Sequence, residues 1–135
     1  MIFLRCSSRC VASKSQSIDT GPHRKGFSTQ PNPLRVETPI DGKSAVSEFS
    51  LQHVSVGGER SLVEVSIETG RKHQVRRHLA ELGHPVIGDR RYGAGEDDGV
   101  DLQLTACLLA LQCPVNDRPV EYRLDAKWLP TIGPD

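Results

Sequence analysis

Alternating apolar and polar residues predict two antiparallel strands in the middle of the chain. Every second residue is apolar across 63–67. Earlier, the apolar positions of 49–51 and of 54–56 follow opposite phases, which indicates a β-bulge near Gln52–His53. Gly57–Gly58 lies between these stretches and is typical of a hairpin turn. We therefore expect a β-hairpin with one buried face and one solvent-exposed face.

A helical pattern follows the second strand directly. Val75, Leu79 and Leu82 have the spacing of one helix face, which can be buried against the strands. Thr69 is the expected N-cap, because its hydroxyl can accept a hydrogen bond from the free amides of the first turn. Gly83 suits the left-handed position after the helix, and Pro85 prevents the helix from resuming. The pattern predicts one main helix between Thr69 and Gly83.

The remaining patterns complete the expected fold class. Leu102 to Leu111 is the most apolar run of the chain, and we expect a short helix or turn there that leads into a core strand. Alternation across 120–124 predicts a last strand, and 128–130 would close the domain. The sum is an α+β domain, in which an antiparallel sheet packs against one main helix.

The first 43 residues differ from the rest in composition. Residues 1–30 are basic and rich in serine, with Asp19 as the only acid, which is typical of a mitochondrial or plastid transit peptide. A disordered basic segment fits the same composition, and without targeting the chain would be cytoplasmic. Residues 31–43 contain three prolines and a glycine and are expected to be an extended linker. The folded domain would then span 44–130.

Composition excludes several classes of protein. The 135 residues suffice for one domain, and the hydrophobic fraction of 36% indicates that part of the chain lies outside the core. The formal net charge is zero, so any attraction to nucleic acid must be local. No apolar run approaches membrane-spanning length. The four cysteines lack the two-residue gap of a zinc knuckle, and we predict no metal site.

Cations gather where the helix is expected to begin. The stretch 71–77 contains four cations and no acid: Arg71, Lys72, Arg76 and Arg77. Positive charge in a first helical turn opposes the helix dipole and costs about a few tenths of a kcal/mol. A pattern that breaks a local rule in this way indicates a ligand, here an anion such as phosphate or carboxylate. The alternative is an ordinary solvated basic face.

The residues themselves favour a ligand. Residues 69–78 read Thr-Gly-Arg-Lys-His-Gln-Val-Arg-Arg-His, and Gly-His-Pro-Val-Ile-Gly-Asp and Tyr-Gly follow at 83–89 and 92–93. This string resembles the C-terminal signature of the RluA-type pseudouridine synthases, and part of it is similar to the RsuA type. The resemblance covers about Val36 to Pro130. It implies part of the catalytic domain of an enzyme that isomerises uridine in rRNA or tRNA to pseudouridine, with neither cofactor nor metal.

The resemblance also implies roles for individual residues. In this family an ionised aspartate attacks a flipped-out nucleotide, and an arginine beside it keeps the carboxylate charged. By its position in the motif, Arg76 resembles that arginine. The expected RNA-binding residues are Arg71, Lys72, His73, Gln74 and Arg77. Arg77 also fits an ordinary surface position, as does His78, and Asp89 is expected to fix its Gly-Asp turn.

The sequence departs from the family pattern in one important respect. The catalytic aspartate normally lies upstream of the signature, in an Arg-Leu-Asp segment followed by Thr-Ser-Gly, and this chain contains no such segment. An upstream Lys-x-Tyr element is missing as well. Arg123-Leu124-Asp125 has the right residues, but it lies in the expected last strand, without Thr-Ser-Gly, and we interpret it as coincidence.

Three hypotheses follow from this departure. The chain could be a pseudouridine synthase family member that is inactive because its catalytic aspartate is absent. It could be a non-catalytic RNA-binding module that uses the cations of 71–77. It could also be a scaffold or partner-binding fragment, because an incomplete sheet exposes an edge that another chain can pair with.

Overall fold

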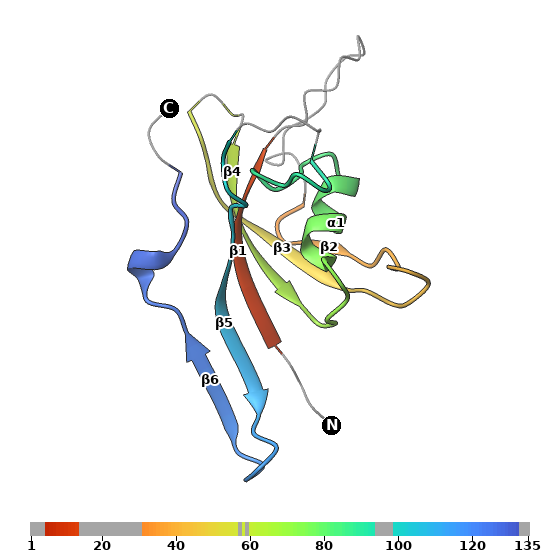
Figure 1. The fold of residues 1–135 in the computed structure, drawn as a ribbon, viewed down its shortest axis with the longest axis vertical. Helices are drawn as coiled ribbons and strands as arrows, with labels where there is room; N and C mark the ends of the chain where they lie inside the picture. Colours follow the sequence, from red (N-terminus) through yellow and green to blue (C-terminus); the bar gives the residue numbers. More distant parts are fainter. Residues whose placement is uncertain (1–4, 14–30, 57, 59, 94–98, 133–135) are drawn as a thin grey trace.

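The computed structural model describes residues 5–13, 31–56, 58, 60–93 and 99–132, the first of these ranges by its backbone. These residues form a six-stranded antiparallel sheet with one α-helix against it (Figure 1). The strand order is β2-β3-β4-β1-β5-β6. The elements are β1 (Arg5–Ser13), β2 (Leu34–Val36), β3 (Ser47–Val54), β4 (Arg60–Ile67), α1 (Gln74–Glu81), β5 (Leu104–Gln112), β6 (Pro119–Arg123) and a short 3-10 helix (Ala126–Trp128). The predicted α+β class is confirmed.

The hairpin predicted from alternation is confirmed. β3 pairs with β4 in antiparallel register, and the register shifts between Leu51 and His53, where the phase change in the sequence indicated a bulge. Phe49 of β3 and Val63 and Val65 of β4 are fully buried. The alternating positions therefore form the inner face of the sheet.

The predicted end of the helix is correct, but its predicted start is wrong. α1 begins at Gln74, with His73 at the N-cap in the left-handed region (φ 54°, ψ 30°) and no side-chain cap hydrogen bond. Thr69 is not the cap, because its hydroxyl accepts a hydrogen bond from the amide of Val46, the residue before β3. At the other end, Gly83 has φ +78°, as the left-handed position requires.

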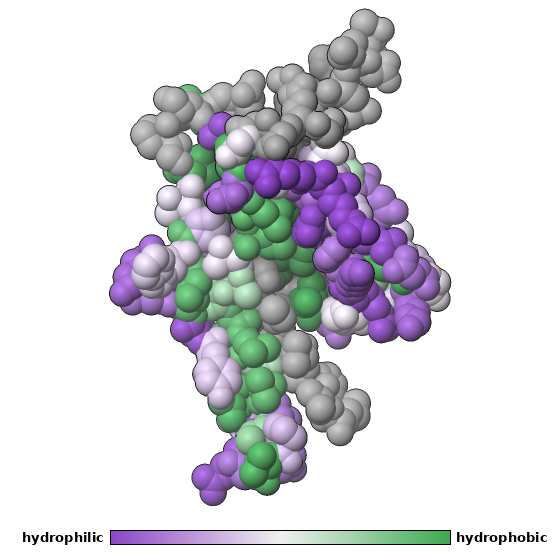
Figure 2. All heavy atoms as spheres, in the orientation of Figure 1, coloured by the Kyte–Doolittle hydropathy of each residue, from purple (hydrophilic) through white to green (hydrophobic). Residues whose placement is uncertain are grey.

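The core lies between α1 and the strands behind it, and α1 covers the part of the sheet that contains β2 and β3 (Figure 1). Val75 and Leu79 face inward, and Leu82 packs against the cluster from its edge. The buried cluster consists of Val36, Phe49, Val63, Val65, Val75, Leu79 and Val86. In the described part of the chain, α1 does not extend over β5 and β6, and Figure 2 shows an apolar strip along β5.

The apolar run after residue 101 forms β5, so the expected short helix or turn is wrong there. β6 follows as the predicted last strand. Trp128 was expected to close the domain, but its side chain is 66% exposed. The apolar residues of β5 are mostly half-buried.

The sheet uses residues that the sequence analysis placed outside the folded domain. Residues 5–13, expected within a targeting or disordered segment, form β1 and pair with β4 on one side and β5 on the other. β2 lies inside the expected linker and pairs with β3. Organelle targeting and the domain boundaries remain predictions. No helix in the described ranges is long and apolar enough to cross a membrane.

Candidate functional site

Arg76 and Asp89 form a two-point ion pair at the start of α1. Arg76 Nε donates to Asp89 Oδ2 at 2.8 Å, and Nη2 donates to Oδ1 at 2.7 Å. Oδ1 also accepts from the backbone amides of Arg91 and Tyr92, each at 3.0 Å. The Asp89 side chain is 0% exposed and that of Arg76 is 18% exposed. One buried carboxylate therefore joins the first turn of α1 to the turn at 89–93.

The charges of this pair support each other. Burial by itself would raise the pKa of Asp89, but hydrogen bonds from Arg76 and from the amides of Tyr92 and Arg91 outweigh it, and the pKa is lowered. The hydrogen bond to Asp89 raises the pKa of Arg76. Both groups are therefore ionised at neutral pH. The carboxylate also offsets the unfavourable position of Arg76 in the first helical turn, which contains no acid of its own.

Tyr92 lies among the cations of this region. The Cζ atoms of Arg76 and Arg91 lie 5.2 and 5.6 Å from the centroid of its ring, within cation–π range. Its hydroxyl lies 3.0 Å from His73 Nδ1, and the two rings meet edge to face with centroids 5.7 Å apart. We call His73, Arg76, Asp89, Arg91 and Tyr92 the α1 entrance cluster.

His73 is neutral at pH 7 in this setting. Burial lowers its pKa, and the nearby charges of Arg76, Arg91 and Lys72 lower it further. A neutral imidazole can accept a hydrogen bond from the Tyr92 hydroxyl at Nδ1 when its own proton lies on Nε2, and can donate to that hydroxyl in the other tautomer. In either tautomer His73 Nδ1 is occupied by Tyr92, and Nε2 is the ring nitrogen that Tyr92 does not use.

The two cations before α1 differ in their contacts. Arg71 Nε donates to the backbone oxygen of Ser44 at 2.8 Å, which uses one nitrogen of its guanidinium in an exposed contact. Lys72 is exposed. Figure 2 shows a hydrophilic surface over α1 and the turn that follows it, beside the apolar strip of β5. Arg71, Lys72 and the α1 entrance cluster thus lie at the same end of the helix.

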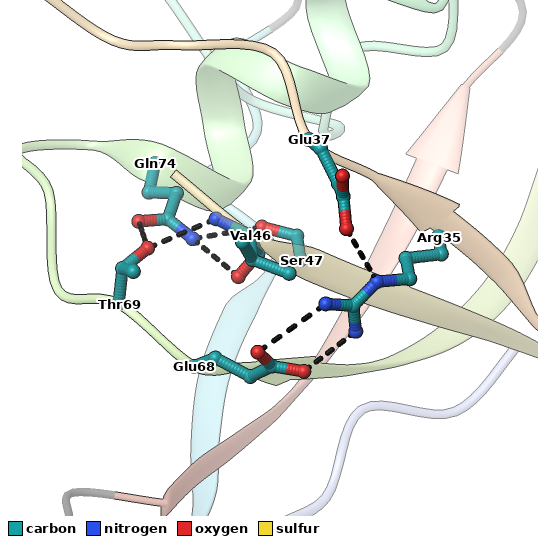
Figure 3. Close-up of polar contacts among 7 residues, drawn as sticks. All are labelled: Arg35, Glu37, Val46, Ser47, Glu68, Thr69 and Gln74. Carbon is teal, nitrogen blue, oxygen red and sulfur yellow. Dashed lines mark hydrogen bonds and ion pairs between the residues drawn. The ribbon is translucent and has the colours of Figure 1, made fainter. Parts of the chain in front are cut away.

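Gln74 was expected at an RNA contact, but both polar atoms of its side chain make hydrogen bonds within the fold (Figure 3). Its Oε1 accepts from the Thr69 hydroxyl at 2.7 Å and from the Arg71 amide at 3.1 Å. Its Nε2 donates to the Val46 carbonyl at 2.8 Å and to Ser47 Oγ at 3.0 Å. Because the side chain is also buried, Gln74 attaches the start of α1 to β3.

The expectation of a surface position for His78 is wrong, since its side chain is fully buried. Its Nε2 lies 2.9 Å from the Thr38 carbonyl, and its Nδ1 lies 2.9 Å from Ser47 Oγ. A carbonyl can only accept, so Nε2 bears the proton and Nδ1 accepts from the Ser47 hydroxyl. Ser47 in turn accepts from Gln74, so the buried polar groups form one connected network.

Arg77 does not join the α1 entrance cluster. Its Nη1 donates to both carboxylate oxygens of Asp41 at 3.0 Å, which ties the outer side of α1 to the turn at 40–43. This exposed pair gives Arg77 a structural contact away from the cations at the helix start. Of the six predicted site residues, His73 and Arg76 both contact Tyr92, and Lys72 lies close enough to act on His73 through its charge. The Arg71 side chain contacts Ser44, Gln74 is buried against β3, and Arg77 pairs with Asp41.

Sequence analysis assigned no site role to Arg91 or Tyr92 and gave Asp89 only a local one. All three follow α1, and Asp89 and Tyr92 belong to the string of residues that resembles the family signature. Spacing could not show that Asp89 reaches back 13 residues to Arg76. The available signal was the presence of a carboxylate directly beyond a cation-rich helix.

The described part of the chain contains no group of three or more histidines, cysteines or acids that could hold a metal ion. No disulfide joins Cys107 to Cys113, and the side chains of Cys6 and Cys10 lie outside what the structure describes. The chemistry available at the start of α1 is therefore that of cations, an aromatic ring and a neutral imidazole. This set suits a phosphate-bearing ligand with planar bases.

Comparison with known proteins agrees with this chemistry. The family model of RNA pseudouridylate synthase matches residues 10–81, which is more than half of the chain. The uncharacterized RNA pseudouridine synthase YhcT of Bacillus subtilis is 45% identical over 64 residues, covering 47% of this chain and 21% of that protein. The tRNA pseudouridine synthase C of Salmonella typhi is 41% identical over 81 residues, covering 53% of this chain and 31% of that protein.

Relatives and solved structures extend the comparison. RNA pseudouridine synthase 2, chloroplastic, of Oryza sativa is 38% identical over 71 residues, covering 50% of this chain and 16% of that protein. The structure of human RNA Pseudouridylate Synthase Domain Containing 1 has a TM-score of 0.69 at 23% identity, covering 94% of this chain and 56% of that chain. This likeness shows the fold. The chain spans less than a third of the length of these curated relatives. The matched family model confirms the RluA-type resemblance, and the chain belongs to the RNA pseudouridylate synthase family.

Proposed function

We propose that this chain binds RNA through the α1 entrance cluster together with Arg71 and Lys72, and that it does not isomerise uridine by itself. The observation that supports binding is the two-point contact of Arg76 with Asp89, which holds a guanidinium beside an aromatic ring at the cation-rich helix start. Membership of the family supports RNA as the ligand and uridine isomerisation as the reaction that the complete site performs.

The arrangement suits single-stranded or flipped-out RNA. Arg71, Lys72, Arg76 and Arg91 can each contact a backbone phosphate, and the ring of Tyr92 gives an aromatic surface next to Arg76 and Arg91. The whole chain has zero formal net charge, so attraction to RNA must come from this local group of cations. Binding should therefore be weak and strongly dependent on salt.

Two observations support the absence of turnover by this chain alone. Asp89 is the carboxylate that contacts Arg76, but it is fully buried and accepts four hydrogen bonds, so it cannot attack a nucleotide. The sequence has no Arg-Leu-Asp segment followed by Thr-Ser-Gly. In Arg123-Leu124-Asp125, Arg123 pairs with Glu121, and Asp125 caps the 3-10 helix by accepting from the Lys127 amide.

Incubation with tRNA and rRNA transcripts tests both parts of the proposal. We expect the chain to bind the transcripts at low salt, with weaker binding after Arg71→Ala, and to form no pseudouridine detectable by chemical labelling. Clear turnover would refute the claim about activity. Failure to bind any of the transcripts at low salt would refute the claim about RNA.

A partner chain that completes the sheet is a second candidate function. β6 pairs with β5 along one side and lies at the end of the strand order. Val115 beside it, Tyr122 on it and Trp128 after it are 89%, 62% and 66% exposed, which is unusual for such large apolar side chains. A partner strand on β6 would slow hydrogen exchange of its outward-facing amides. If the β6 amides exchange equally fast in buffer and in a cell extract that contains the partner, this candidate is wrong.

We also propose an organelle location, mitochondrion or plastid, from the basic and serine-rich composition of residues 1–30. A chloroplastic relative supports it. Because residues 5–13 form β1, cleavage after residue 13 would remove the strand between β4 and β5. We therefore expect a fluorescent fusion of the whole chain to enter an organelle and to keep residues 5–13. A cytoplasmic fusion would contradict the proposal.

A further inference from the structure

We infer that Asp89 is the positioning residue of the RNA-binding surface: one carboxylate fixes the guanidinium of Arg76 and the turn that presents Arg91 and Tyr92. This inference rests on the proposed RNA binding and adds the claim that binding depends on the placement of these cations as well as on their charge. Asp89 itself is buried and does not touch the ligand.

Each contact of Asp89 restrains a different neighbouring group. The pair of hydrogen bonds from Nε and Nη2 sets the plane of the Arg76 guanidinium, because a two-point contact allows neither rotation nor sliding. The second terminal nitrogen, Nη1, is not used by Asp89 and remains available for another acceptor. The amides of Arg91 and Tyr92 bind Oδ1, so the direction of these two side chains depends on the same carboxylate.

The turn itself is built close around Asp89. The Gly93 amide donates to the Asp89 carbonyl at 2.8 Å, and a Cβ at Gly93 would lie 2.4 Å from that oxygen. A residue other than glycine would therefore push the turn open. The same aspartate thus organises the turn through both its backbone and its side chain, next to a ring that lies within cation–π range of two guanidiniums.

Asp89→Asn separates the effect of net charge on RNA affinity from the effect of where the cations are held. This variant removes one negative charge, so an effect of charge alone would tighten binding to RNA. If placement matters, Asp89→Asn weakens binding by about fivefold or more, which is the lower end of the cost of losing one guanidinium contact. The negative slope of log K against log salt would also become shallower by about 0.7, because one phosphate contact is lost. A change of stability that leaves the contacts intact would not lower this slope.

The matched control is Asp41→Asn. Asp41 also pairs with an arginine of α1, but on the outer side of the helix, and its substitution changes the net charge by the same amount. We expect Asp41→Asn to bind a uridine-containing single-stranded RNA as tightly as the parent or more tightly. Equal binding by Asp89→Asn and Asp41→Asn would overturn the inference while leaving the proposed function intact. Absence of binding by the parent would refute both.

Arg76→Lys covers the case in which Asp89→Asn does not fold. Lysine keeps the charge but cannot make the two-point contact with a carboxylate. Arg77→Lys is its control, since Arg77 contacts Asp41 instead. Weaker binding by Arg76→Lys than by Arg77→Lys, with both variants folded by circular dichroism, supports the inference. Equal binding by these two variants would overturn it.

Discussion

Asp89 offsets the unfavourable position of a cation in the first turn of α1. Arg76 stands in the first turn of α1, where a cation opposes the helix dipole, and that turn contains no acid. The compensating charge comes from 13 residues further along the chain and lies within 2.8 Å of the guanidinium. A rule broken within one element is thus satisfied by the tertiary structure, at the position where the ligand is expected.

The lowered pKa of Asp89 makes the stability of the fold depend on pH. Because the pKa is lower in the folded chain, the contribution of Asp89 is fully present above the unfolded value of about 3.9 and is lost as the pH falls through the folded value. Asp89→Asn should lower the free energy of unfolding at pH 7 by about 3 kcal/mol, the usual cost of breaking a buried pair. The free energy of unfolding, measured with urea at a series of pH values, should also fall less steeply at acid pH in this variant than in the parent. A fall as steep as that of the parent would contradict this assignment.

Gln74 should matter for stability through hydrogen bonds alone. Gln74→Ala leaves the Val46 carbonyl, the Arg71 amide and the Ser47 hydroxyl each without one partner, and we expect a loss of about 2–3 kcal/mol in urea unfolding. Gln103→Ala is the control, because Gln103 makes one exposed side-chain bond, to the Asp101 carbonyl, and should cost about 0.5 kcal/mol or less. Equal losses would show that the buried network contributes little.

At the scale of elements, alternation and spacing predicted those parts of the fold whose side chains face one core. The hairpin of β3 and β4, its bulge and the inner face of α1 all follow such a pattern. The start of α1 did not, because Thr69 has two possible partners and its hydroxyl contacts the Val46 amide in place of the first helical turn. A propensity for capping cannot show which amide is nearer.

The glycines around α1 allow a test at this scale. Gly83 and Gly88 have nearly the same positive φ, +78° and +73°. Because an alanine is strained at such an angle, either substitution should lower the free energy of unfolding by about 1 kcal/mol. A Cβ at Gly83 meets nothing within 4 Å, but one at Gly88 would lie 2.4 Å from the Asp101 carbonyl oxygen. Gly88→Ala should therefore lower the urea midpoint clearly more than Gly83→Ala. Equal midpoints would show that residues 100–101 do not pack on this turn.

At the scale of the whole molecule, the placement of β1 was the largest difference between expectation and structure. Residues 5–13 lie in a basic, serine-rich segment whose composition indicates targeting, yet their backbone pairs with both β4 and β5. Strand pairing uses the backbone, which every residue has, so a pattern of side chains could not predict this position. The candidate site had the same limit, because Asp89, Arg91 and Tyr92 reach the helix start only through the tertiary fold.

Removal of residues 1–13 should divide the sheet into two parts. β5 and β6 would keep only each other, and an isolated two-stranded hairpin is marginally stable. Hydrogen exchange should then become fast in β5 and β6 and stay slow in α1 and β3, which share the core. The whole chain is the control and should keep slow exchange in all four elements. Slow exchange in β5 after the longer deletion would show that β1 is not needed to hold the sheet together.

The salt dependence of RNA binding tests the account most directly. If Arg71, Lys72, Arg76 and Arg91 each neutralise a phosphate of a single-stranded RNA, log K should fall with log salt with a slope of about −2.8. Arg71→Ala should make this slope shallower by about 0.7, whereas Arg123→Ala, which removes a cation paired with Glu121 on β6, should leave it unchanged. Equal slopes for these two variants, or binding that does not respond to salt, would contradict an RNA-binding surface at the start of α1.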